Sequence, residues 1–236
     1  MTAPSPSPSP SGTSGLITPP PHDARRRLAW KVIGWALLLG GLGVLSWLAW
    51  AMFATNFGTR AAQEDLLEQW VRRSGASDFV ETPVLSGAAT GGGSGGAVGL
   101  LTFEREGERI LRDEPLVVVR GVTPQDLAKG PGHYPGSALP GQVGNMAVAG
   151  HRTTHDAPFA NIDVLVPGDH VIVEDDAGAV WTYVVLEQRI VTPSDTSVIS
   201  SDPLGNGAPM LTLTTCHPRY SNRQRLIVFA ELLTQA

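Results

Sequence analysis

Residues 98–233 alternate short hydrophobic runs with polar turn signals, which is typical of a chain built from β-strands. In the clearest run, Leu211 and Leu213 alternate with Thr212 and Thr214, as expected for a strand with one buried face. Gly, Pro, Asp and Asn between the runs supply the backbone angles that turns need. Seven or more short strands at this spacing predict a closed barrel or a sandwich. The predicted strands cover residues 98–103, 116–122, 145–151, 170–175, 180–191, 210–216 and 225–232.

A different pattern precedes these strands. Residues 32–54 contain no charged side chain. As a helix rising ~1.5 Å per residue they would reach roughly 34 Å, enough to cross a bilayer core of ~30 Å. Four basic residues lie in the fifteen positions before this run and one, Arg60, in the fifteen after it, so we expect a transmembrane anchor with a cytoplasmic N-terminus and an extracellular body. The four before the run are Arg25, Arg26, Arg27 and Lys31.

A cleaved signal peptide is the alternative, because Ala49, Trp50 and Ala51 resemble its cleavage site. The apolar run is longer than the ~7–15 residues usual in signal peptides, which favours the uncleaved anchor.

Composition divides the rest of the chain. Residues 1–31 begin with a Pro- and Ser-rich stretch that cannot bury enough apolar surface to fold, so we predict a disordered cytoplasmic tail. Residues 55–97 combine a helical pattern over 59–73 with a Gly-rich linker over 87–97. Residues 98–236 then form the single folded domain, with short helices near 123–130 and 157–165 and Thr123 as a cap.

Charge and cysteine content exclude several functions. The net charge is −5; residues 1–31 carry +3, so the remainder of the chain, with −8, is acidic. Such a surface argues against nucleic-acid binding, which needs Lys and Arg to replace phosphate counterions. The chain has one cysteine, Cys216, which excludes an intrachain disulfide and a zinc site built on several cysteines.

Cys216 ends a predicted strand and is the candidate nucleophile. A cysteine nucleophile needs a nearby base, and His151, at the end of another apolar strand, can supply one. His155, four residues on, is the main rival. Arg225 opens the strand that follows Cys216 and could stabilise an oxyanion, whereas Arg219 and Arg223 are more typical of solvated surface residues.

These motifs together resemble the sortases, the cysteine transpeptidases of the Gram-positive surface. The segments are AGH (149–151), TLTTC (212–216) and RLIVFA (225–230), in that order behind a membrane anchor. Longer stretches, over residues 130–141, 149–159 and 212–228, are similar to class E sortases of high-GC actinobacteria. The resemblance implies an all-β fold, an eight-stranded sortase-type barrel with short helices after one transmembrane helix. It also implies Cys216 as nucleophile, His151 as general acid and base, and Arg225 as the oxyanion-binding residue.

The resemblance further implies cleavage of an LAXTG or LPXTG sorting signal between Thr and Gly through a thioester. The partners would be surface proteins bearing that signal, a lipid-linked peptidoglycan precursor amine and the membrane, with no nucleic acid. Tyr134 is a hypothetical contributor to the pocket that accepts Ala in the signal, and Thr215 a hypothetical substrate-binding residue. An L,D-transpeptidase-like wall enzyme and a non-catalytic wall-binding barrel are the alternatives.

We expect no cofactor and no required metal. Glu174, Asp175 and Asp176 are adjacent on a predicted turn, and calcium sites need ligands at wider, regular spacing.

Overall fold

A computed structural model describes residues 22–75 and 96–233 of the chain. It divides into two units, residues 1–49 and 50–236, which are described separately below. The Gly-rich linker predicted over 87–97 lies almost wholly outside the described residues.

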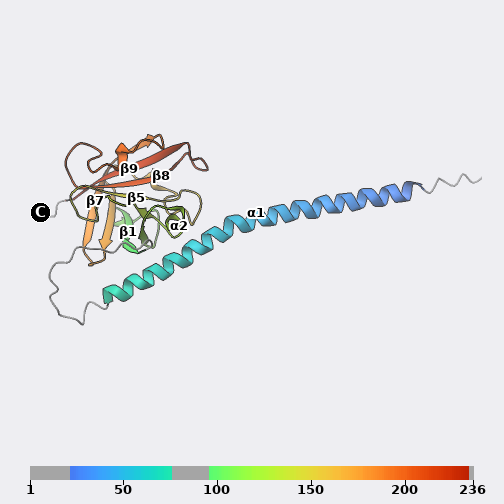
Figure 1. The fold of residues 1–236 in the computed structure, drawn as a ribbon, viewed down its shortest axis with the longest axis horizontal. Coiled ribbons are helices and arrows are strands. Elements are labelled where there is room, and N and C mark those ends of the chain that lie inside the picture. Colours follow the sequence, from blue (N-terminus) through green and yellow to red (C-terminus); the bar gives the residue numbers. More distant parts are fainter. Residues whose placement is uncertain (1–21, 76–95, 234–236) are drawn as a thin grey trace, which may run out of the picture. The chain divides into compact units, whose positions relative to one another are not determined.

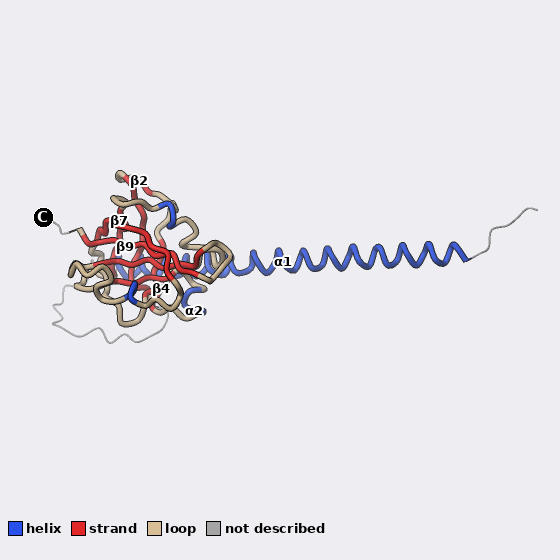
Figure 2. Tube along the Cα trace, turned by 90° about the horizontal axis from the view of Figure 1, so that it is seen from above, coloured by secondary structure: helices blue, strands red, loops and turns tan. Residues whose placement is uncertain are grey.

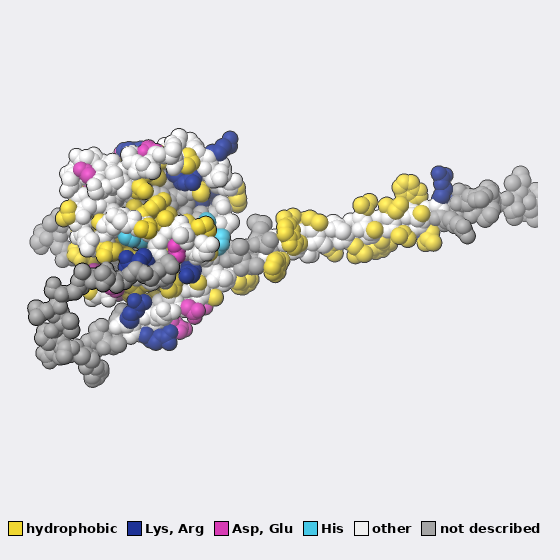
Figure 3. Space-filling view, viewed as in Figure 1, with side chains coloured by type: hydrophobic (Ala, Val, Ile, Leu, Met, Phe, Trp, Pro, Cys, Tyr) yellow, Lys and Arg dark blue, Asp and Glu magenta, His cyan; other side chains and the backbone are white. Residues whose placement is uncertain are grey.

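One long helix, α1 (His22–Gly75), contains both the apolar run and the predicted helix after it. It begins directly after Pro21, before the predicted span, and the next proline is Pro83. Proline interrupts helices, whereas the Ala, Leu and Arg that dominate between these prolines favour them, which explains the continuity. In the N-terminal unit, 23 residues, Arg26–Leu48, are long and apolar enough to cross a membrane. Figure 3 shows hydrophobic side chains along this part of α1, with basic residues near its start.

The C-terminal unit is a β-barrel of mixed strand direction (Figures 1 and 2). In the described residues, eight strands form a closed ring in the order β1-β3-β4-β5-β8-β9-β7-β6, and β6 pairs back with β1. The short β2 extends β1 as a hairpin outside the ring. The predicted eight-stranded barrel is therefore confirmed. The strands are β1 (Ala97–Arg105), β2 (Glu108–Arg109), β3 (Leu116–Arg120), β4 (Gly132–His133), β5 (Asn145–Ala149), β6 (His170–Asp175), β7 (Val180–Val191), β8 (Met210–His217) and β9 (Gln224–Leu232).

Short helices connect some of these strands. Helix α2 (Pro124–Leu127) is capped as predicted: Thr123 accepts a hydrogen bond from the Asp126 backbone, and the Asp126 carboxylate accepts one from the Thr123 backbone. The second predicted helix is shorter than expected, a single 3₁₀ turn, η2 (Ile162–Val164). A further 3₁₀ turn, η3 (Ser197–Ile199), precedes β8.

Two strand pairs are parallel, β3 with β4 and β5 with β8, and the other neighbours are antiparallel. In the β5–β8 pair, Ala149 lies opposite Thr214. Parallel strands end at the same edge of a sheet, so the residues that follow β5 and those that end β8 meet at one edge of the barrel.

Buried side chains form two layers on β8 and β9. Leu211 and Leu213 point into the barrel interior, where they join the main apolar core. Met210 and Phe229 lie on the outer face and form a smaller core with Val198 of η3. The loop that contains η3 therefore covers part of the outside of the barrel next to β8.

The C-terminal turns of α1 pack against the barrel within the same unit. Leu66 and Trp70 are buried against Val117 and Val119 of β3. The side-chain amide of Gln63 donates to the carbonyls of Val117 and Lys129, and its oxygen accepts from the Val117 amide. Gln63 thus fills a gap in the ladder beside β3 that the two-residue β4 leaves open.

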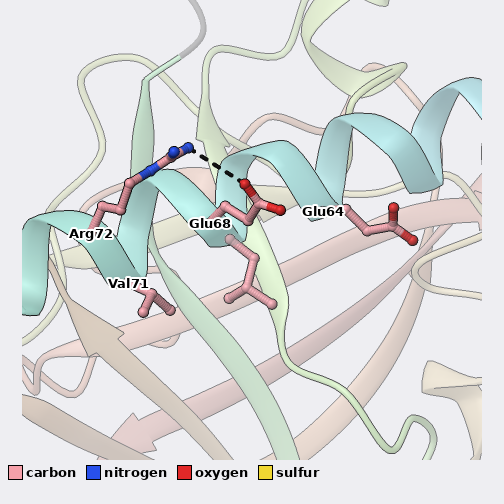
Figure 4. Close-up of a pocket in the computed structure, with 5 residues that line it drawn as sticks. Glu64, Glu68, Val71 and Arg72 are labelled. Carbon is pink, nitrogen blue, oxygen red and sulfur yellow. Dashed lines mark ion pairs between the residues drawn. The ribbon is translucent and has the colours of Figure 1, made fainter.

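A groove of about 500 Å³ follows the exposed side of this helix end (Figure 4). Glu68 and Arg72 form an ion pair of 3.5 Å across one helical turn there, and Glu64 lies one turn earlier on the same side. Because both partners are highly exposed, this pair contributes little to stability.

Candidate active site

Cys216 and Arg225 are direct cross-strand partners in the antiparallel β8–β9 pair. Leu213 of β8 and Leu226 of β9 face the interior, so alternation places Cys216 and Arg225 together on the outer face. Cys216 is half-buried.

His151 joins them through the parallel pairing of β5 and β8. The register continues beyond the last paired residues, since the Gly150 amide donates to the Thr214 carbonyl at 3.0 Å. Two residues beyond the Ala149–Thr214 pair on both strands, residue 151 is level with residue 216. The structure thus brings the ends of β5, β8 and β9, with the imidazole, thiol and guanidinium predicted from the sequence, to one edge of the barrel.

Gly150 is required by close packing at this strand end. A Cβ at this position would lie 2.6 Å from the ring of Phe159, closer than real side chains approach. Phe159 is fully buried and packs edge-on against Phe103 at 6.4 Å between ring centroids. The glycine therefore lets the segment that carries His151 lie directly on the core.

His151 is half-buried and stacks on His155, with ring centroids 4.6 Å apart and an interplanar angle of 21°. Burial lowers the pKa of His151, and repulsion from the neighbouring His155 lowers it further. The neutral imidazole is therefore favoured at neutral pH, the form that can accept a proton from a thiol.

The guanidinium of Arg225 is partly exposed and faces the loop before β9. Its Nη1 donates to the carbonyls of Asn222 and Gln224, each at 3.0 Å. These two bonds orient the side chain at the strand end. An arginine keeps several further N–H donors in a fixed plane, which suits a developing oxyanion.

Thr215 lies differently from the sequence-based expectation. Its side chain is 3% exposed, and its hydroxyl donates to the Gly150 carbonyl at 2.8 Å. Because successive strand residues face opposite sides, Thr215 points inward while Cys216 points outward. Thr215 therefore joins β8 to the residue before His151.

Tyr134 lies on the outer face of the barrel, beside Thr214. Its hydroxyl is 3.3 Å from the Thr214 hydroxyl, and Thr214 and Cys216 share that face. Tyr134 also lines a cavity of about 450 Å³ between the loop after β4 and the loop that contains η3. Asn145, Ile199 and Ser201 are among the other lining residues.

Arg152 is a site residue that the sequence analysis missed. It is 4% exposed, and it donates to the Cys216 carbonyl at 3.3 Å and to Nδ1 of His217 at 2.9 Å. Asp163 pairs with it at 2.9 Å. This guanidinium thus holds the end of β8 against the loop after β5. The available signal was its position directly after His151.

The remaining histidines of the barrel have other roles. His133 is buried, and its Nε2 lies 2.9 Å from both the Ala138 carbonyl and the Ser137 hydroxyl. Burial is the main reason that the pKa of His133 is lowered. His170 begins β6, far in the ring order from β8.

The acidic turn after β6 is satisfied by its own hairpin. The Asp175 carboxylate accepts from the amides of Ala177 and Ala179 and from the indole of Trp181. Among the residues that the structure describes, no three His, Cys, Asp or Glu side chains are grouped to hold a metal ion.

A closed barrel that presents a thiol, an imidazole and a guanidinium at adjacent strand ends has the chemical groups of a cysteine-dependent acyl transferase. A family model, the sortase domain, matches residues 111–233, more than half of the chain. The chain therefore belongs to the sortase family, which confirms the resemblance seen in its sequence.

Individual relatives agree with this assignment. The chain is 33% identical over 113 residues to sortase SrtE1 of Streptomyces coelicolor, covering 44% of this chain and 32% of the relative. It is 36% identical over 103 residues to sortase D of Bacillus subtilis, covering 44% and 48% respectively. The matched region thus spans about a third to a half of these relatives.

Solved structures show the same fold. Sortase E from Streptomyces avermitilis is 36% identical with a TM-score of 0.50, and the match covers 58% of this chain and 88% of that one. The SrtF sortase from Corynebacterium diphtheriae is 29% identical with a TM-score of 0.56, covering 65% and 92%.

Proposed function

We propose that this chain is a membrane-anchored cysteine transpeptidase of class E type. It cleaves an LAXTG- or LPXTG-type sorting signal between Thr and Gly and joins the released surface protein to the amine of a lipid-linked peptidoglycan precursor. The observation that carries the proposal is the Cys216–Arg225 cross-strand pair at the end of β8, beside the end of the parallel strand β5. Membership of the sortase family supports it.

In this mechanism Cys216, His151 and Arg225 act in sequence. The neutral His151 imidazole takes the thiol proton, and the thiolate attacks the Thr carbonyl carbon of the signal. Donors of Arg225 stabilise the tetrahedral oxyanion. His151, now an imidazolium, protonates the departing Gly amine, and a thioester to Cys216 remains.

The second half-reaction reverses these roles. The acceptor amine attacks the thioester carbonyl while His151 takes its proton. The C–S bond then breaks, the thiol regains a proton from His151, and a new amide joins the surface protein to the wall precursor. Each half-reaction leaves the imidazole neutral: the proton taken from the thiol departs on the Gly amine, and the proton taken from the acceptor amine returns to the thiol.

Tyr134 contributes to recognition of the residue after Leu in the signal. The bond to Thr214 holds its hydroxyl on the face that carries Cys216, and its ring lines the neighbouring cavity. Tyr134→Ala should reduce the preference for LAXTG over LPXTG, and Tyr134→Phe tests the hydroxyl alone. An unchanged preference in Tyr134→Ala, measured as the ratio of kcat/KM values, contradicts this role.

The apolar stretch of α1 anchors the enzyme, with the N-terminus in the cytoplasm and the barrel outside. The basic residues before the stretch support this orientation. Protease added to intact spheroplasts should remove the barrel and leave the N-terminal tail protected. Protection of the barrel would contradict the orientation.

Cleavage by the full-length protein in detergent micelles tests the function. Quenched LAXTG and LPXTG peptides are compared, with a small amine added as acceptor, beside Cys216→Ala, His151→Ala and Arg225→Ala. We expect cleavage and amine transfer by the wild type and loss of both in Cys216→Ala. No cleavage of either peptide by the folded wild type would favour a non-catalytic wall-binding barrel.

A further inference from the structure

The loop between β5 and η2 contains three consecutive residues in a left-handed backbone conformation. The φ angles are 54° at His155, 56° at Asp156 and 43° at Ala157. None of these residues is glycine, and residues with a Cβ rarely adopt a positive φ angle. Such a conformation persists only where surrounding contacts hold it. The loop must therefore be held from outside.

Asp156 supplies the attachment. Arg60 donates through Nε to Oδ1 at 2.8 Å, and Arg112 donates through Nη2 to Oδ2 at 2.6 Å. A second Arg112 nitrogen lies 3.3 Å from the Asp156 carbonyl. The Asp156 amide donates to the side-chain oxygen of Asn56 at 2.9 Å. Every polar atom of Asp156 is thus bonded, and we call this set of four residues the Asp156 clamp.

The clamp connects the loop that carries Asp156 to two segments that are distant from it in sequence. Asn56 and Arg60 belong to α1, and Arg112 precedes β3. Burial alone would raise the pKa of Asp156, but the hydrogen bonds from Arg112 and Arg60 outweigh it and lower this pKa. The carboxylate is therefore charged at neutral pH and keeps both arginines.

His155 lies between the clamp and His151. It directly precedes Asp156, and its ring covers the His151 imidazole at 4.6 Å. The other end of the loop is also fixed, because the Phe159 amide donates to the His151 carbonyl at 3.0 Å. Movement of Asp156 therefore moves the ring that shields His151, while the backbone at His151 stays in place.

We propose that Asp156 is a positioning residue for the catalytic histidine: with Asn56 and Arg60 of α1 and with Arg112, it fixes His155 over the His151 imidazole. The inference rests on the proposed function for the catalytic role of His151. If so, the part of α1 that follows the apolar stretch is one of the elements that support the active site.

The ionisable groups around His151 set the expected direction. His155 stacks on it, Arg152 is the next residue, and Cys216 and Arg225 occupy the neighbouring strand ends. Releasing His155 exposes the His151 ring to water and removes the electrostatic effect of His155 that lowers the pKa of His151. Both changes favour the imidazolium, so the pKa of His151 should rise toward its ordinary value.

Histidine titration by NMR tests this without any need for activity. Full-length protein in micelles carries labelled histidine, and a His151→Gln variant assigns the resonance. In Asp156→Ala the His151 titration should move to higher pH, and His155→Phe should retain the cover and show a smaller change. Glu68→Ala, which breaks the ion pair farther along α1, is the matched control and should leave the titration unchanged.

Kinetics give a second readout. In Asp156→Ala the acidic limb of the kcat/KM profile should move with the NMR titration, and kcat should fall roughly ten-fold while KM changes little. If Asp156→Ala fails to fold, Arg60→Ala is used; it removes the bond from α1 to Oδ1 and should move the His151 titration in the same direction by a smaller amount. An unchanged His151 titration in a folded clamp variant overturns the proposal. Absence of peptide cleavage by the wild type would instead overturn the proposed function and leave the titration to decide the positioning role.

Discussion

Substitution of Gln63 by alanine should loosen the joint between α1 and the barrel. The side chain makes three hydrogen bonds, to the Val117 amide, the Val117 carbonyl and the Lys129 carbonyl, at 2.8, 3.1 and 2.7 Å. Each bond contributes about 1 kcal/mol, so the variant should lose about 3 kcal/mol of unfolding free energy. For a unit of this size that corresponds to a melting temperature lower by roughly 6–12 °C.

Calorimetry of the full-length protein in micelles measures the global loss. Hydrogen exchange measured by mass spectrometry then tests the location, because the Val117 amide loses its acceptor while the Val119 amide keeps its bond to the Pro131 carbonyl. Exchange should accelerate at Val117 and change little at Val119.

Two variants sharpen the test. Gln69→Ala removes the same type of side chain at an exposed position on the same helix and should leave the free energy of unfolding almost unchanged. Gln63→Glu places a carboxylate oxygen against two carbonyls and should destabilise at least as much as alanine. A loss below about 0.5 kcal/mol in Gln63→Ala, within the range of ordinary surface substitutions, would refute the reasoning.

Three further outcomes can be measured by thermal denaturation. Thr123→Ala removes the α2 cap and should cost about 1 kcal/mol, whereas Thr123→Ser should cost much less. Gly150→Ala places a methyl group against Phe159 and should cost about 1–3 kcal/mol, and simultaneous Phe159→Leu should recover part of the loss if the clash is the cause. Because the pKa of His133 is lowered by burial, the unfolded state binds its proton first, so stability should fall as pH drops below about 6.5. His133→Gln should make that fall shallower, and an identical pH profile would contradict the assignment.

Much of the barrel was predictable because its long strands follow the alternation rule. Each predicted run became a strand, and the ends shifted by only a few residues. The strands β2 and β4 have two residues each, which is too short for an alternation of hydrophobic and polar residues to be recognised in the sequence. The length of α1 was missed because its charged and apolar parts have different patterns, although no proline separates them.

The grouping of the candidate site residues was predictable where it depends on strand ends. Cys216, His151 and Arg225 each terminate or begin an apolar run, and the pairing of those runs brings them together. The inward direction of Thr215 could also have been predicted, since Leu213 two residues earlier is interior.

Arg152 and the Asp156 clamp depend instead on contacts between distant segments. Arg60 and Asp156 are separated by 96 residues, and no local pattern links them. The left-handed backbone conformation at residues 155–157 could not be predicted from the sequence either, because the segment contains no glycine, the residue that normally indicates a positive φ angle.

The parallel pairing of β5 with β8 also determines when the site can exist during folding. Residues 150 and 215 are separated by 65 positions, so their contact requires a long loop to close before the strand ends can meet. Strand β9, which carries Arg225, lies at the very end of the described chain. Because β9 is the last strand of the described barrel, a chain emerging N-terminus first would complete this edge only after the other barrel strands had emerged. Under the proposed function, a product truncated before β9 would present the thiol without Arg225 and should lack activity.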